Sequence, residues 1–275
     1  MDTKKINNNY TLRPKPYTLT IGWLYPDLMS TYGDRGNILA LQKRCEWRGI
    51  TVKILPITPD TTIYELQTTN LLFGGGAQDR EQEIVMRDLK GNKGKSIINL
   101  IEHNIPSLFV CGSPQLMGNF YEPSVGKRIE GLGIFDMETR HPGLDDRLIG
   151  NVVAKVNWDN LQLPTTYNLP TTNYILGFEN HGGRTTLGKA AKPFATVIKG
   201  NGNNGLDGTE GVVYKNAIGC YFHGPLLPKN PYIADFLIQK ALEVTYEEEI
   251  TLTPLDDTME KQAQRAMLEK LGINS

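Results

Sequence analysis

The chain has 275 residues, of which 39% are hydrophobic and 21% are charged, and its formal net charge at pH 7 is −1. This composition predicts a globular protein with a sizeable core, and the balanced charge argues against a broad nucleic-acid or membrane footprint. No apolar run approaches the length of a membrane span, and the polar residues 1–15 lack the apolar core of a signal peptide. Three widely spaced cysteines, Cys45, Cys111 and Cys220, form no metal-type pair and leave an odd thiol, which favours a reducing cytoplasm.

The first part of the chain alternates predicted strands and helices. Residues 1–16 are rich in Asn and Lys and predict a flexible tail, whereas residues 17–25 and 50–55 predict two strands. Between these strands, residues 32–37 form a glycine-containing loop that leads into a helix. Asp34 in this loop is suited either to cap the helix or to contact a ligand. The strand–helix–strand order predicts a parallel sheet with a right-handed crossover.

A triple glycine follows the third predicted strand, which covers residues 71–73. The backbone N–H groups of Gly74, Gly75 and Gly76 can come close to a ligand and point at an anion. A plain strand-to-helix turn is the alternative, but it needs fewer glycines. No Gly-Lys-Ser/Thr follows, so this is not a nucleotide loop, and a ligand-facing loop is favoured.

The rest of the chain is organised around residues 105–118. A short apolar run predicts a buried strand that ends at Cys111, Gly112 permits a sharp turn, and residues 115–117 fit the first turn of a helix. A helix N-terminus there favours a thiolate, and its free N–H groups can hold an oxyanion. The alternative is a buried structural cysteine.

One histidine is the candidate base for this cysteine. His223 leaves a predicted strand at residues 217–222 and enters a loop rich in Gly and Pro. A lone histidine at a strand end is commonly structural, but Cys111 lies at another strand end and a thiolate mechanism needs a base. Near the C-terminus, a capping-box pattern at Asp257 predicts a last helix whose apolar stripe packs on the domain or on a partner.

These motifs, in this order, resemble the class I (triad) glutamine amidotransferases. The similarity is greatest to the cobyric-acid-synthase-like branch and, within it, to the GatD-type glutaminase subunits of lipid II isoglutaminyl synthases. It spans roughly residues 17–243. The segments that carry it are YGDRGN (32–37), GGGAQDREQ (74–82), CGSPQLMG (111–118), GFENHGGRT (177–185) and HGPLLPKN (223–230).

The resemblance implies an α/β fold with a flavodoxin-like amidotransferase domain at residues 17–248, in which helices cover both faces of a mostly parallel sheet. Beyond the resemblance, residues 249–275 are predicted to form a C-terminal helical extension. The implied enzyme hydrolyses L-glutamine to glutamate and ammonia and needs no cofactor or metal in this chain.

The implied partner is a MurT-like subunit of the Mur ligase family. This partner uses ATP and a metal ion to amidate the D-glutamate α-carboxylate of lipid II in peptidoglycan biosynthesis. Three alternatives remain: a subunit for another ATP-dependent amidation of the cobyric-acid type, another cysteine hydrolase that acts on γ-glutamyl substrates, and a non-catalytic binding subunit with the same fold.

The resemblance also assigns roles to individual residues. Cys111 matches the nucleophile and His223 matches its base. Arg147 matches an arginine that holds the substrate carboxylate, although Arg147 lies between acids and a surface ion pair is the alternative. The implied oxyanion-hole donors are the N–H groups of Gly75, Gly76 and Gly112. The accessory candidates are Asp34, Gln115 and His181.

The sequence departs from the family pattern at two places. Ser113-Pro114 replaces the usual Gly-Tyr, and Pro225 stands where many triad amidotransferases carry Glu. A catalytic histidine needs an acid or a carbonyl to fix its tautomer. We therefore expect the partner to supply the orienting acid for His223, with Glu179 and Glu210 the first candidates if the acid lies within this chain.

Overall fold

The computed structural model of this chain describes residues 16–143, 146–164, 166–170 and 173–273. The predicted N-terminal tail therefore lies outside the described residues, except for its last position.

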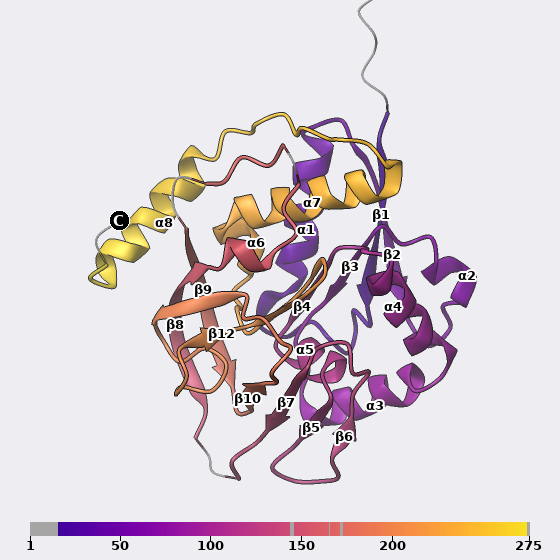
Figure 1. Ribbon diagram of the computed structural model, residues 1–275, viewed down its shortest axis with the longest axis vertical. Coiled ribbons are helices and arrows are strands. Elements are labelled where there is room, and N and C mark those ends of the chain that lie inside the picture. Colours follow the sequence, from indigo (N-terminus) through magenta and orange to yellow (C-terminus); the bar gives the residue numbers. More distant parts are fainter. Residues whose placement is uncertain (1–15, 144–145, 165, 171–172, 274–275) are drawn as a thin grey trace, which may run out of the picture.

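Six strands form the central sheet in the order β13-β14-β4-β3-β1-β2 (Figure 1). The five parallel strands are β1 (Thr18–Leu24), β2 (Thr51–Ile57), β3 (Leu71–Gly74), β4 (Ser107–Val110) and β14 (Ala217–Cys220). At one edge, β13 (Val212–Tyr214) runs antiparallel to β14. Every residue of β3 and β4 is buried, which explains why both read as continuous apolar runs. The predicted α/β class is confirmed.

The order of the strands determines where the loops singled out by the sequence meet. Strands β14, β4, β3 and β1 are consecutive neighbours and run in one direction. Their carboxyl ends therefore lie at one edge of the sheet, where open α/β sheets bind ligands. The segments that leave this edge contain Asp34, the triple glycine, Cys111 and His223.

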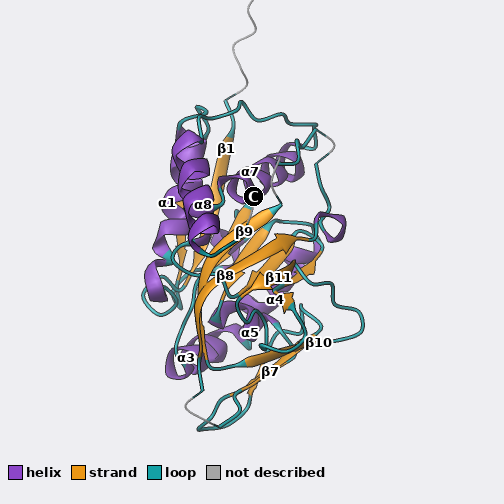
Figure 2. Ribbon diagram, turned by 90° about the vertical axis from the view of Figure 1, so that its left-hand side faces the viewer, coloured by secondary structure: helices purple, strands orange, loops and turns teal. Residues whose placement is uncertain are grey.

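Helices cover both faces of the sheet (Figures 1 and 2). One face carries α1 (Arg35–Glu46), α6 (Leu226–Lys229) and α7 (Pro231–Tyr246), which share one hydrophobic cluster with residues of β1, β3 and β4. Cys45 belongs to this cluster, as its helical spacing predicts. A second cluster includes residues of the helices on the other face, namely α2 (Ile63–Leu66), α3 (Asp79–Leu89), α4 (Asn92–Glu102) and α5 (Gly112–Met117).

Two four-stranded sheets extend the domain beyond the central sheet. The first has the order β10-β7-β5-β6 and the second has the order β12-β11-β8-β9. The first consists of β5 (Phe120–Glu122), β6 (Ile129–Glu130), β7 (Met137–Arg140) and β10 (Arg184–Leu187). The second consists of β8 (Leu148–Val156), β9 (Tyr174–His181), β11 (Ala195–Lys199) and β12 (Thr209–Glu210). Short 3₁₀ helices occur at η1 (Thr31–Gly33) and η2 (Trp158–Asn160).

The C-terminal helix α8 (Thr258–Lys270) lies beside the second of these sheets (Figure 1). Its Leu268 packs against Val153 of β8 and Leu176 of β9. The predicted capping box is not formed, because the Asp257 side chain caps no N–H and instead pairs with Arg44 of α1 at 2.6 Å.

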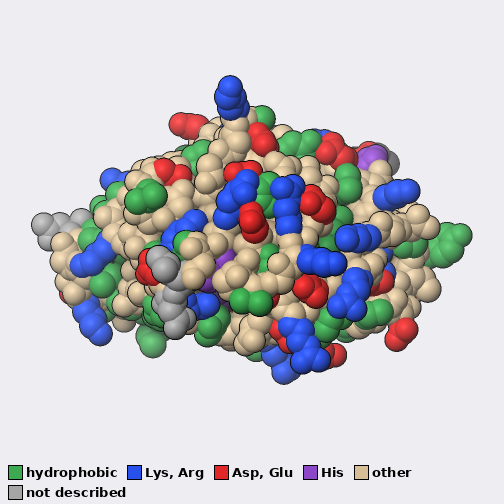
Figure 3. Space-filling model, turned by 90° about the horizontal axis from the view of Figure 1, so that it is seen from below, with side chains coloured by type: hydrophobic (Ala, Val, Ile, Leu, Met, Phe, Trp, Pro, Cys, Tyr) green, Lys and Arg blue, Asp and Glu red, His purple; other side chains and the backbone are tan. Residues whose placement is uncertain are grey.

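Charged side chains of both signs are interspersed on the face shown in Figure 3. This distribution agrees with the small net charge. Within the described residues, the structure contains no helix that is both long enough and apolar enough to cross a bilayer.

Candidate active site

Cys111 occupies a strained turn between β4 and α5. Its backbone angles are φ 56° and ψ −99°, and its N–H donates to the carbonyl oxygen of Cys220 at 2.8 Å. The residue is only 8% exposed, yet it lines a cavity of about 910 Å³. A positive φ at a residue with a side chain is costly, and such strain occurs where a nucleophile is presented at a strand-to-helix turn. The geometry therefore favours a functional cysteine over a structural one.

The unusual Ser113-Pro114 pair fits this turn. The Ser113 Oγ donates to the Gly75 carbonyl at 2.7 Å and ties the elbow to the glycine loop. A Cβ on Gly74 would lie 2.4 Å from that Oγ, so the space used by Ser113 exists because residue 74 is glycine. Pro114 is the third residue of α5, where a backbone N–H has no acceptor within the helix. The departure from Gly-Tyr therefore leaves the elbow intact.

His223 is held by an acid of the same chain. Its Nδ1 lies 3.0 Å from Oδ1 of Asp34, and both side chains are fully buried. The second oxygen, Oδ2, accepts the N–H of Gly76 at 2.6 Å. An ionised carboxylate only accepts, so Nδ1 carries the proton and Nε2 is left as the basic nitrogen. The expectation that a partner supplies this acid is thus corrected, because Asp34 occupies the orienting position.

The packing of α1 explains how Asp34 reaches the histidine. A Cβ on Gly36 would lie 2.4 Å from Cγ of Pro225, so the first turn of α1 lies directly against the loop after His223. The Oδ1 of Asn37 accepts the N–H of Leu227 at 2.9 Å. Pro225, which stands in place of the Glu expected from the resemblance, packs against the helix that follows Asp34.

Cys111 and His223 meet at Gly76. A Cβ on Gly76 would lie 2.9 Å from Cε1 of His223 and 3.3 Å from Cβ of Cys111, so only glycine leaves room for both side chains. Nε2 of His223 is buried and makes no hydrogen bond with another described residue. Burial lowers the pKa of His223, but the Cys111 sulfur and the Asp34 carboxylate outweigh burial and raise it to about 10. The raised pKa favours the protonated imidazole ring at neutral pH, so Nε2 accepts a proton readily and can later donate it.

The oxyanion-hole prediction needs one correction. The Gly76 N–H is already bonded to Asp34, so it does not point at Cys111 as a free donor. Gly112 is the first residue of α5, and its N–H has no intrahelical acceptor. Ala77 lies next to Gly112: a Cβ added to Gly112 would be 2.9 Å from the backbone nitrogen of Ala77. Ala77 and Cys111 both line the cavity. The predicted donors Gly75 and Gly112 stay predictions, and Ala77 is a donor that the sequence did not single out.

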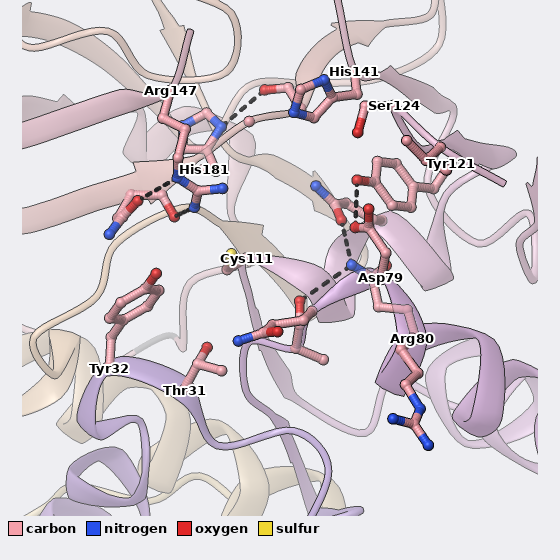
Figure 4. Close-up of a pocket in the computed structure, with 18 of the residues that line it drawn as sticks. Thr31, Tyr32, Asp79, Arg80, Cys111, Tyr121, Ser124, His141, Arg147 and His181 are labelled. Carbon is pink, nitrogen blue, oxygen red and sulfur yellow. Dashed lines mark hydrogen bonds between the residues drawn. The ribbon is translucent and has the colours of Figure 1, made fainter. Parts of the chain in front are cut away.

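Arg147 lies on the rim of the cavity, across from Tyr32 and Thr31 (Figure 4). Its Nε donates to Oδ1 of Asn180 and its Nη2 donates to the Asn180 carbonyl, both at 2.9 Å. Both of these bonds go to Asn180, and no ion pair of Arg147 with an acid occurs among the described residues, which do not include residues 144 and 145. Asn180 thus fixes a guanidinium at the mouth of the cavity, where it can meet an anionic group of a ligand.

His181 and Gln115 form part of the cavity wall. Nδ1 of His181 lies 2.9 Å from the Gly183 carbonyl, and the ring stacks on Tyr221 with a centroid distance of 3.9 Å. Burial lowers the pKa of His181 to about 4, so this ring is neutral at physiological pH. Gln115 bonds to Gln82 at 3.0 Å and to the Tyr221 hydroxyl at 3.2 Å. Both accessory candidates therefore shape the cavity, and neither contacts His223 through a hydrogen bond.

Glu179 and Glu210 do not orient the histidine. Glu179 accepts N–H groups of Asn201 and Gly202, each at 2.8 Å. Glu210 accepts the Tyr221 N–H at 2.7 Å, and burial raises its pKa to about 8. Both carboxyls thus support loops around the site.

No cluster of three or more His, Cys, Asp or Glu side chains suited to a metal occurs within the part of the chain that the structure describes.

The chain is similar to proteins that contain a glutamine amidotransferase domain. Residues 20–231 match the CobB/CobQ-like glutamine amidotransferase domain. The GatD subunit of the glutamine-hydrolysing lipid II isoglutaminyl synthase from Streptococcus pneumoniae is 40% identical over 90% of this chain and 89% of its own length. The corresponding subunit from Staphylococcus aureus is 36% identical over 92% of this chain and 96% of its own.

Among solved structures, a chain of the PurLQS complex from Thermotoga maritima covers 85% of this chain and 100% of its own length. Its TM-score is 0.54 and its sequence identity is 15%, a level of similarity that concerns the fold.

Proposed function

Because the chain belongs to the CobB/CobQ-like glutamine amidotransferase family, we propose that Cys111, His223 and Asp34 hydrolyse L-glutamine and that the ammonia serves a lipid II isoglutaminyl synthase. The observation that carries this proposal is the contact of Asp34 with His223 beside the strained Cys111, at a cavity whose rim holds Arg147.

The geometry supports a sequence of four steps. The Cys111 thiolate attacks the side-chain amide carbon of glutamine, while Arg147 binds the substrate α-carboxylate. The N–H groups of Gly112 and Ala77 stabilise the resulting oxyanion. The His223 imidazolium donates its Nε2 proton to the leaving nitrogen, which departs as ammonia and leaves a thioester. Water, activated by the now neutral imidazole, then attacks the thioester and releases glutamate and the thiol.

Asp34 contributes without reacting itself. By accepting Nδ1–H, it fixes the tautomer in which Nε2 faces the thiol, and its charge favours the imidazolium that the mechanism needs. Tyr32 covers the histidine with an edge-on contact at 5.0 Å between ring centroids. The ring limits solvent access to the imidazolium.

The proposed partner is an ATP-dependent ligase of the Mur ligase family that amidates the D-glutamate α-carboxylate of lipid II. Support comes from the GatD relatives, which are subunits of a glutamine-hydrolysing lipid II isoglutaminyl synthase and match 90% and 92% of this chain. In this proposal the ligase subunit binds ATP and the metal ion, and the complex works in the cytoplasm. The odd number of cysteines in this chain is consistent with that reducing compartment.

The decisive experiment measures glutamate and ammonia release from glutamine by the purified chain, alone and with its cognate ligase, and lipid II amidation by the mixture. We expect glutamine-dependent amidation that stops with Cys111→Ala but continues when free ammonia is added. Amidation that needs added ammonia even with the wild-type chain would overturn the proposal.

A further inference from the structure

A groove separate from the active-site cavity lies between α8 and the strands β8 and β9. We call it the α8 groove; its volume is about 560 Å³. Its walls are mostly apolar and include Leu176, Met259 and Met267. Met259 is 76% exposed, so its side chain is accessible to an incoming surface. Methionines adapt to the shape of an incoming surface and are frequent at binding sites.

One cation in the α8 groove has no counter-charge. Lys229 lines the groove, is partly buried, and makes no hydrogen bond or ion pair within the described residues. Its Nζ lies close to the backbone, 2.8 Å from where a Cβ on Gly224 would be. Burial lowers the pKa of Lys229, with no carboxylate near enough to oppose the effect. The other charged residue of the groove, Glu260, forms no ion pair with it. An ammonium in apolar surroundings is stabilised by an incoming carboxylate.

The α8 groove is built partly by a helix that lies outside the matched family domain. The helix α8 lies outside residues 20–231, the part that matches the family domain. The helix is nevertheless firmly attached, because the Asp257–Arg44 ion pair anchors its start and Leu268 packs on the sheet. A groove built with this extension is therefore available for a partner that the broader family does not share.

The groove also lies next to the backbone of His223. Gly177 and Gly224 line it, and their chain neighbours Phe178 and His223 exchange two backbone hydrogen bonds of 2.8 and 3.1 Å. A segment seated in the groove would lie next to the isolated β-bridge between Phe178 and His223.

We propose that the α8 groove is a docking site for a segment of the ligase subunit that presents an apolar side chain next to a carboxylate, with the carboxylate paired to Lys229. This inference rests on the proposed function, because it assumes that the ligase is the partner. The apolar side chain packs between Met259 and Met267, and the carboxylate supplies the missing counter-charge.

The test measures the affinity of the full-length chain for its cognate ligase by calorimetry. We expect Lys229→Glu and Met267→Asp each to weaken binding at least about tenfold, because reversing or burying an unpaired charge at a contact is costly. Lys229→Met keeps the aliphatic stem and should fold normally while losing several-fold in affinity. Lys261→Glu, on an exposed position of the same helix, is the matched control and should bind within about twofold of wild type.

Three results would overturn the proposed docking site. The first is a ligase affinity within about twofold of wild type for both Lys229 variants. If the same preparations still hydrolyse glutamine, the proposed chemistry is unaffected by that result. A wild-type chain that binds no ligase would overturn the proposed partnership and the docking site with it. Decanoate binding that depends on Lys229, together with unchanged ligase affinity, would assign the groove to a small amphipathic anion instead and would equally overturn the proposal.

Discussion

Asp34→Asn is the substitution that probes the site most directly. The Asp34 carboxylate accepts two buried hydrogen bonds, from Nδ1 of His223 at 3.0 Å and from the Gly76 N–H at 2.6 Å. Asparagine has nearly the same shape but only one acceptor oxygen. If that oxygen keeps the Gly76 N–H, the amide NH₂ faces Nδ1 and the ring must adopt the other neutral tautomer. Nε2 then carries the proton and cannot accept one from Cys111.

Two magnitudes follow from this geometry. The wrong tautomer should lower kcat for glutamine hydrolysis by as much as about 10⁴-fold, the loss known for an Asp-to-Asn change in a triad. One buried hydrogen bond to a charged acceptor is lost, so the free energy of unfolding should fall by about 1–3 kcal/mol. The pKa of His223, raised to about 10 in the wild type, should fall because one of the two charges that raise it is gone. Loss of the imidazolium should therefore occur at lower pH in the variant.

The assay is glutamate release at saturating glutamine across a pH series, with unfolding by denaturant as the measure of stability. Asp27→Asn, at an exposed position of the same chain segment, is the control and should change neither quantity measurably. A folded Asp34→Asn chain with kcat within about tenfold of wild type would refute the orienting role of Asp34. Full recovery of the variant by added ligase would instead show that the partner supplies the acid.

Three further predictions address other residues of the site. Cys111→Ala should abolish ammonia release without unfolding the chain, whereas Cys45→Ala should keep activity; activity in the first variant would rule out this nucleophile. Arg147→Ala should weaken glutamine binding by on the order of 1.5–3 kcal/mol, or roughly tenfold or more, and Arg147→Lys should restore part of the affinity. Calorimetry in a Cys111→Ala background measures this affinity, and an affinity equal to that of Cys111→Ala alone would contradict the proposed role of Arg147. The Glu210 pKa is raised to about 8, so its contribution to stability is complete below about pH 4.5 and is lost as the pH rises through 8. Glu210→Gln should therefore gain stability relative to wild type as the pH rises from about 4.5 to about 8 and no further above that, and a pH-independent difference would contradict the buried-acid assignment.

The sequence alone determined the fold class and the identity of the elbow. Short apolar runs bounded by glycines and alternating with helical patterns are enough to predict a parallel sheet, because such strands must be buried on both faces. The small residue after Cys111 and the glycines at 74–76 likewise predict a nucleophile turn facing a glycine loop. These inferences need only local sequence, since each depends on the backbone conformations that neighbouring residues can adopt.

The source of the orienting acid was decided by tertiary structure. Asp34 and His223 are 189 positions apart, and local sequence offers no measure of their distance. They meet because β1 and β14 end at the same edge and because Gly36 lets α1 approach Pro225. The same contact takes the Gly76 N–H away from the predicted oxyanion hole. The strand order alone is enough to place Asp34 near the site. Which N–H group bonds to each oxygen of Asp34 depends on packing distances of a few tenths of an ångström. Side chains from several helices and strands determine these distances together.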